Sequence, residues 1–312
     1  MIEISRVNKA YDGRAIVSDL TLTIPEGALC VLLGLSGCGK STTLRMINRL
    51  VPHDSGTIRV GGEDVNAVAP EALRRRIGYA IQSTGLFPHW QVEDNIATVP
   101  RLLAWPAARV AARVHELLSL LRLDVAEYRG KYPHELSGGQ QQRVGVARAL
   151  AADPELLLMD EPFGALDPVT RAGLRTEFAR IHATTGKTIL FVTHDMDEAL
   201  ELADVIAVLE NGRLVQFGSS RDIVERPATE FVRDLLGRAE IGLKRLAVQR
   251  VEERMRPGQA PGEGKGPAIE MSSTLKEALA RMLALRTDRL MVRDAGGAVV
   301  GSITLAQLVQ SS

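Results

Sequence analysis

The chain has 312 residues, and its 38 basic and 38 acidic side chains leave a formal net charge of zero. This balance gives no support to a general nucleic-acid-coating role. A hydrophobic content of 45% with 24% charged residues is typical of a globular protein long enough for one large domain or two. No uncharged apolar run approaches the roughly 18 to 20 residues that cross a bilayer, and the N-terminus lacks the pattern of a signal peptide, so we expect a cytoplasmic chain. Its two cysteines, Cys30 and Cys38, are expected to be reduced thiols.

Two strand patterns occur in the first 220 residues. Alternating apolar residues around 2–7, 20–24 and 58–60 predict antiparallel strands with one solvated face. Nearly continuous apolar runs predict strands buried on both faces, as in a parallel sheet covered by helices, at 28–33, 156–159 and 188–193. The sequence therefore predicts an α/β fold with a parallel core sheet and an N-terminal antiparallel β subdomain.

Helical spacing and a hairpin complete this first domain. Apolar residues recur at helical intervals between Leu86 and Leu136, which predicts an inserted helical subdomain. The pair Asn211-Gly212 separates apolar runs at 205–209 and 214–217, a pattern typical of a β-hairpin.

The composition changes after about Gly237. The segment 257–267 contains three prolines and four glycines in eleven positions, which is typical of a linker. After it come a predicted helix at 274–285 and strands at 289–292 and 299–303. We expect one domain over 1–238, a connection over 239–267, and a small α+β domain over 268–312 that needs a partner to bury its apolar face.

The segment Gly34 to Thr42, GLSGCGKST, fits the pattern of a phosphate-binding loop between a buried strand and a helix expected over 42–50. Its backbone N–H groups and the helix N-terminus favour phosphate, Lys40 reaches the β and γ oxygens, and the Ser41 hydroxyl can bind Mg²⁺. The residues expected to contact the nucleotide are Gly34, Ser36, Gly37, Cys38, Gly39, Lys40, Ser41 and Thr42.

The thiol of Cys38 lies within this loop. Proximity to Lys40 and to a helix N-terminus predicts a lowered pKa and a reactive thiol. The alternative is that Cys38 is only a small buried filler.

Two adjacent carboxylates, Asp160 and Glu161, follow the buried strand at 156–159. Ligands bind at the carboxyl ends of strands in open α/β sheets, so acids at this position favour catalysis over simple helix capping. Asp160 is expected in the Mg²⁺ shell, and Glu161 is expected to orient or deprotonate the water that attacks the γ-phosphate.

The segment Leu136 to Arg143, LSGGQQQR, predicts a second helix N-terminus able to bind an anion. One ATP does not need two such sites from one chain. The pattern therefore favours a head-to-tail homodimer, in which Ser137, Gly138, Gly139 and Gln140 of one subunit cover the nucleotide held by Lys40 of the other.

Together these motifs resemble the ATP-binding subunit of ABC transporters, from the N-terminus to about Leu236. The resemblance implies that Tyr11 stacks on adenine and that Gln82 touches both Mg²⁺ and the attacking water. It also implies that Asp167 belongs to the loop that reports across the dimer, and that His194 bonds the γ-phosphate. ATP and Mg²⁺ are the implied cofactors.

Two segments, Ser83 to Pro100 and Leu44 to Gly56, resemble the ATPases of importers for glycine betaine, choline and related osmoprotectants. The resemblance implies separate permease subunits that contact Ser83 to Pro100, an extracytoplasmic solute-binding protein, and a peripheral location on the cytoplasmic face of the plasma membrane. It implies no nucleic-acid partner.

The tail from Ser272 to Gln310 is similar to one CBS motif. A pair of motifs normally builds the binding cleft, and Gln307, three residues after Thr304, occupies the place of the Asp that bonds a ribose. We therefore expect the tail to make a dimer contact or to respond to ionic conditions, and not to sense nucleotide.

Two alternatives remain open. The ATPase of an exporter or of an amino-acid importer has the same catalytic motifs and differs in partner surface and tail. A non-transport ABC ATPase of the DNA-repair or ribosome type needs a coiled-coil insertion or a second cassette, and neither fits between Gln82 and Leu136.

Overall fold

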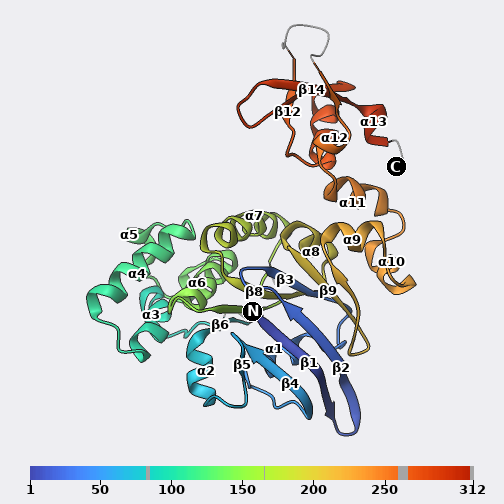
Figure 1. Ribbon diagram of the computed structural model, residues 1–312. Helices are drawn as coiled ribbons and strands as arrows, with labels where there is room; N and C mark the ends of the chain where they lie inside the picture. Colours follow the sequence, from blue (N-terminus) through green and yellow to red (C-terminus); the bar gives the residue numbers. More distant parts are fainter. Residues whose placement is uncertain (82–84, 165, 259–265, 310–312) are drawn as a thin grey trace. The chain divides into compact units, whose positions relative to one another are not determined.

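The computed structural model describes residues 1–81, 85–164, 166–258 and 266–309. It contains two compact units, Met1–Ser219 and Ser220–Ser312, which are described separately (Figure 1). The helices and strands keep the labels of Figure 1.

The centre of the first unit is a six-stranded sheet with the order β10-β9-β3-β8-β7-β6. Its strands are β3 (Leu29–Leu33), β6 (Ile77–Ala80), β7 (Leu156–Asp160), β8 (Thr188–Thr193), β9 (Val205–Glu210) and β10 (Arg213–Gly218). All neighbours are parallel except β9 and β10. Every residue of β3, β7 and β8 is buried, so the predicted doubly covered parallel sheet is confirmed. The edge hairpin is also confirmed, with Asn211 and Gly212 at φ 49° and 78°.

A second, antiparallel sheet has the order β2-β1-β4-β5. Its strands are β1 (Ile2–Tyr11), β2 (Arg14–Ile24), β4 (Ser55–Val60) and β5 (Glu63–Asp64). Buried and exposed residues alternate along β2, as expected for a strand with one solvated face. Its apolar side chains share a core with α1 and one face of the six-stranded sheet.

Helices lie on both faces of the six-stranded sheet, and α3, α4 and α5 form a group to one side of it (Figure 1). The helices of the first unit are α1 (Lys40–Ile47), α2 (Pro70–Arg76), α3 (Val92–Leu102), α4 (Ala107–Leu120), α5 (Val125–Tyr128), the 3-10 turn η1 (Pro133–Glu135), α6 (Gly138–Leu150), α7 (Pro168–Thr185) and α8 (Met196–Leu202). The helix expected over 42–50 begins earlier, at Lys40, and ends at Ile47 because Arg49 adopts a left-handed φ of 49°. Within the described ranges, no helix is both long and apolar enough to cross a bilayer.

The second unit is built around a four-stranded sheet with the order β11-β14-β13-β12. Its elements are α9 (Ser220–Glu225), α10 (Glu230–Leu236), α11 (Ile241–Val248), η2 (Val251–Glu253), β11 (Arg256–Pro257), β12 (Ala268–Glu270), α12 (Leu275–Leu285), β13 (Arg289–Arg293), β14 (Val299–Thr304) and α13 (Leu305–Val309). Helices α9 and α11 pack together, and the fully buried Val251 joins the core of α12, β13 and β14. The unit starts at Ser220, since α9 packs on α11 and α11 packs on α12. The expected division at 238 and 267 stays a prediction.

Candidate active site

The loop between β3 and α1 can be built only with glycine at two positions. Gly34 and Gly39 have φ values of 156° and 102°. A Cβ atom on Gly34 would lie 2.3 Å from the carbonyl oxygen of Leu209, and one on Gly39 would lie 2.7 Å from that of Ile16. Since neither backbone oxygen can yield, the glycines allow the loop to pack against its neighbours and present the N-terminus of α1.

The ammonium group of Lys40 lies inside this loop. Its Nζ donates hydrogen bonds to the carbonyl oxygens of Gly34 (2.8 Å) and Leu35 (3.0 Å), and the residue is buried. The loop therefore encloses a cation at the place where phosphate oxygens are expected.

The hydroxyl group of Ser41 donates a 2.8 Å hydrogen bond to Oδ1 of the buried Asp160, the last residue of β7. Burial raises the pKa of the Asp160 carboxyl, and Glu161 adds to this, whereas the Ser41 hydrogen bond, Arg45 and Lys40 act in the opposite direction. These two oxygen donors suit Mg²⁺, which usually takes one or two protein ligands and completes its shell with phosphate and water. The described part of the chain has no group of three or more His, Cys, Asp or Glu side chains that could hold a metal by itself.

Glu161 and His194 lie together beyond the ends of β7 and β8. Glu161 has a left-handed φ of 44°, rare for a residue with a side chain, and its N–H donates to the carbonyl oxygen of Val192 (3.0 Å). Its Oε1 is 3.3 Å from Nδ1 of the exposed His194. The structure thus brings together two of the side chains that the sequence analysis selected, 33 positions apart.

A hydrogen-bond network that the sequence analysis missed holds the backbone on either side of His194. The Thr193 hydroxyl donates to Oε2 of Glu198 (2.6 Å) and accepts from the Asp195 N–H (3.0 Å). The Asp195 side chain accepts from the N–H groups of Asp197 and Glu198, which caps α8. Burial raises the pKa of Glu198. The available signal in the sequence was Asp195, an acid three residues before Glu198 at the start of an apolar helical run, which predicts a helix cap.

The N-terminus of α6 is closed by a reciprocal cap. Ser137 Oγ accepts from the Gln140 N–H (3.3 Å), and Gln140 Oε1 accepts from the Ser137 N–H (2.8 Å). The Gln140 amide also donates to the Tyr128 hydroxyl (3.0 Å). Gln140 therefore shapes the helix start within its own chain.

This helix start packs against the start of α7. A Cβ atom on Gly139 would lie 2.6 Å from Cγ2 of Thr170, and Oδ1 of Asp167 accepts from the Thr170 N–H (3.1 Å). Helix α6 also contacts α3, α4 and β6, whereas α1 contacts the antiparallel sheet, β7 and β8. The two helix N-termini expected to bind phosphate thus lie on different faces of the sheet in one chain (Figure 1).

Tyr11 is exposed at the end of β1, with Nζ of Lys9 5.2 Å from its ring centroid. That lysine is held by an ion pair of 2.8 Å with Asp54. Gln82, which is expected to touch Mg²⁺ and the attacking water, lies outside the described residues. Ala165, the first residue of the Ala165-Leu166-Asp167 loop, also lies outside them.

Comparisons with known proteins agree with these features. The family model described as ABC transporter matches residues 17–164. The glycine betaine uptake system ATP-binding protein YehX of Escherichia coli K12 is 50% identical, over 99% of both chains. The chain belongs to the ABC transporter family, as an ATP-binding subunit. The glycine betaine/carnitine/choline transport ATP-binding protein OpuCA of Bacillus subtilis is 45% identical over this entire chain and 80% of its own length.

A solved structure shows the same fold. The ATP-binding cassette MJ0796, in a dimeric post-hydrolysis state bound to ADP and Pi, matches with a TM-score of 0.63 and 30% identity. The match covers 70% of this chain and 98% of that one. The predicted P-loop ABC ATPase fold is therefore confirmed, while the similarity of 268–312 to a CBS motif stays a prediction.

The expectation of a lowered thiol pKa at Cys38 is wrong. Cys38 is only 7% exposed, and burial raises its pKa despite the opposing effect of Lys40. Burial also raises the pKa of Cys30, to about 12. Desolvation of the thiolate thus outweighs the nearby cation, and both residues are thiols at neutral pH.

We predict that iodoacetamide modifies native Cys38 at neutral pH roughly tenfold or more slowly than it modifies the same residue in urea, because the raised pKa leaves little thiolate. The rate in the folded chain should rise as the pH approaches that raised pKa. Mass spectrometry of a Cys30→Ala chain measures this at one thiol. Equal rates in native and denatured chain at pH 7 would show that Cys38 is as reactive as the sequence suggested.

Proposed function

We propose that the chain hydrolyses ATP to power an importer of glycine betaine, choline or a related osmoprotectant. The observation that carries the catalytic part is the convergence of Lys40, Ser41–Asp160 and Glu161–His194 at the carboxyl ends of β3, β7 and β8. Phosphate, metal and water sites are needed within a few ångströms of one another for phosphoryl transfer to water, and these residues can supply all three.

Each group has a role that follows from its chemistry. The N–H groups of Gly34 to Thr42 and the ammonium of Lys40 bind the phosphates. Ser41 and Asp160 would hold Mg²⁺, which neutralises phosphate charge when bound. Glu161 orients or deprotonates the attacking water, and His194 donates to the γ-phosphate, while Gln82 is proposed as an additional ligand near the metal and water.

The Glu161→Gln chain should hydrolyse ATP roughly a hundredfold or more slowly, because the amide keeps the shape but cannot accept a proton. ATP binding, measured by calorimetry, should survive, in contrast to Lys40→Ala. The matched control is Glu155→Gln, the same substitution directly before β7, where the carboxylate pairs with Arg76 at the opposite end of the strand. Native turnover in Glu161→Gln would refute the assigned role.

We further propose that two copies form the active ATPase head to tail. The α6 N-terminus, with Ser137 and Gly139, is separated from the loop of Lys40 within one chain, so a second copy is needed to bring the two together around one nucleotide. The dimeric arrangement of the structurally similar cassette supports this proposal. For Asp167, whose side chain caps α7 beside Gly139, we propose a role in the loop that reports across this dimer.

Ser137→Arg tests this arrangement. A long cation at the cap should block closure over the partner's nucleotide, so hydrolysis should fall by about a hundredfold while ATP still binds. Ser119→Arg, at an exposed position on α4 of the inserted helical subdomain, is the control for a new surface arginine. ATP-dependent dimerisation is followed by light scattering, and a normal dimer with normal turnover in Ser137→Arg would exclude the two-chain site.

The permease is proposed to dock at a groove of about 390 Å³ in the first unit. The groove is lined by apolar groups of the expected contact segment, including Phe87 and Val99, and by the cations Arg74, Arg75 and Arg148. Phe87 is exposed and packs on Trp90, with ring centroids 4.5 Å apart. Arg148, on α6, donates to the Gly85 carbonyl oxygen (2.6 Å), so the groove is tied to the helix that begins at Ser137.

Phe87→Ala should lower ATP-driven uptake of radiolabelled glycine betaine in cells by roughly tenfold, because an exposed aromatic anchor in a groove dominates docking. ATP hydrolysis by the isolated chain should stay within twofold of wild type. Leu102→Ala, at an exposed apolar position at the end of α3, is the control. Unimpaired uptake and unchanged capture of the membrane subunits by Phe87→Ala would place the permease elsewhere.

The proposed solute and location are supported by the relatives. The ATP-binding proteins of a glycine betaine uptake system and of glycine betaine/carnitine/choline transport match over 99% or more of this chain, which includes the tail as well as the cassette. We propose the same solute class, a peripheral position on the cytoplasmic face of the plasma membrane, and an extracytoplasmic solute-binding protein that works through the permease. An amino-acid importer or an exporter is the alternative, and uptake assays distinguish them.

For the tail we propose a dimer contact or a response to ionic conditions, without a tight adenine-nucleotide site. The Gln307 side chain accepts from the Thr304 N–H and hydroxyl, both at 2.8 Å, and donates to the Arg254 carbonyl oxygen (3.0 Å). These bonds hold α13 to the segment before β11. They use both the oxygen and the nitrogen of the Gln307 side-chain amide. Leu283 and Leu305 offer exposed apolar surface for a second copy.

A further inference from the structure

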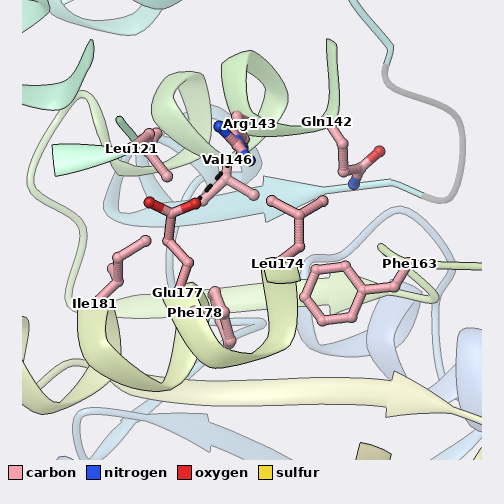
Figure 2. Close-up of a pocket in the computed structure, with 9 residues that line it drawn as sticks. All are labelled: Leu121, Gln142, Arg143, Val146, Phe163, Leu174, Glu177, Phe178 and Ile181. Carbon is pink, nitrogen blue, oxygen red and sulfur yellow. Dashed lines mark ion pairs between the residues drawn. The ribbon is translucent and has the colours of Figure 1, made fainter. Parts of the chain in front are cut away.

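A carboxylate that the proposed mechanism does not use is enclosed between α6 and α7. The side chain of Glu177 is only 5% exposed and points from α7 toward Arg143 on α6 (Figure 2). Its Oε2 lies 3.5 Å from Arg143 Nε, and its Oε1 lies 3.3 Å from Nε of Arg122, which follows α4 in the inserted helical subdomain. One carboxylate thus joins three separate segments of the first unit.

The surroundings of Glu177 are unfavourable for a charge. Apolar side chains line the same pocket, and they are Leu121, Val146, Phe163, Leu174, Phe178 and Ile181 (Figure 2). Neither of the two ion pairs is also a hydrogen bond. Arg143 Nε, in the first pair, and Glu177 Oε1, in the second, have no hydrogen-bond partner. A buried ion pair of this kind adds little stability compared with a well-packed apolar side chain. What it can supply is a defined relative placement of the elements that carry the charges.

Those elements carry parts of the dimer site. Arg143 lies six residues after Ser137, roughly 9 Å along α6. Glu177 lies on the helix whose first turn holds Thr170 against Gly139 and is capped by Asp167. The Arg143–Glu177 pair is therefore a second attachment between α6 and α7, farther along both helices than the Gly139 contact.

We propose that Glu177 is a positioning residue, which through Arg143 and Arg122 sets the N-terminus of α6 relative to the Asp167 loop and the helical subdomain. Ser137 and Gly139 are then presented to the partner's nucleotide in one defined orientation. This inference rests on the proposed function as a head-to-tail ATPase dimer. Glu177 itself touches no reacting atom.

The first test is Glu177→Gln, which keeps the shape and removes the charge. Turnover of the full chain should fall roughly tenfold, while ATP affinity and KM stay within twofold, because the loop around Lys40 is untouched. Arg143→Gln should act in the same way. The double variant should be no slower than the slower single variant, since both changes remove one interaction.

Two further variants keep the test decisive. Glu201→Gln breaks the ion pair of 3.1 Å between Arg175 and Glu201, which joins the same helix α7 to α8, and it should leave turnover within twofold. Arg122→Gln removes a side chain that is 70% exposed, so the chain should fold even if Glu177→Gln does not, and turnover should fall about threefold.

Two results would overturn the inference. One is wild-type turnover in both Glu177→Gln and Arg122→Gln, even with a lowered melting temperature, since the pair would then be structural only. The other is fully additive losses in the Glu177 and Arg143 double variant. If the wild-type and Glu201→Gln chains fail to hydrolyse ATP at all, the proposed function fails, and the inference with it.

Discussion

The parallel alignment of β3, β7 and β8 is the constraint on which the site depends. Parallel strands end at the same edge of a sheet, so the loop of Lys40, the carboxylates Asp160 and Glu161, and His194 emerge side by side although they are far apart in the chain. Full burial of the three strands holds this edge rigid. The 2.8 Å hydrogen bond from Ser41 to Asp160 is the direct result, because it joins the loop after β3 to the end of β7.

Several ionisable groups lie buried around this edge, and each has a partner that offsets its desolvation. Lys40 donates to two carbonyl oxygens of its own loop, Asp160 accepts from Ser41, and Glu198 accepts from Thr193. Burial raises the pKa of both carboxyl groups. Burying an ionisable group lowers the free energy of unfolding, so buried groups of this kind mark positions where the placement of a side chain matters more than stability.

Helix α6 connects three parts of the first unit. Its N-terminus is the capped Ser137, its middle carries Arg143 opposite Glu177, and its last turns carry Arg148, which holds Gly85 beside the proposed permease groove. A rigid helix transmits a displacement along its length. The same helix can thus relate the proposed permease contact to the proposed fit of Ser137 on a partner's nucleotide, if its contacts with α7 hold it in place.

The sequence by itself determined the elements whose signals are local. The glycine pattern from Gly34 to Gly39, the buried runs of β3, β7 and β8, and the Asn211-Gly212 turn depend on backbone freedom and apolar periodicity, which neighbouring residues express. Tertiary structure decided what depends on distant atoms. The pKa of Cys38 rises because burial outweighs the nearby Lys40, Glu177 is enclosed by side chains from three segments, and Val251 completes a core that the sequence assigned to later residues. Desolvation and ion pairing are properties of the packed environment, and no short stretch of sequence contains that environment.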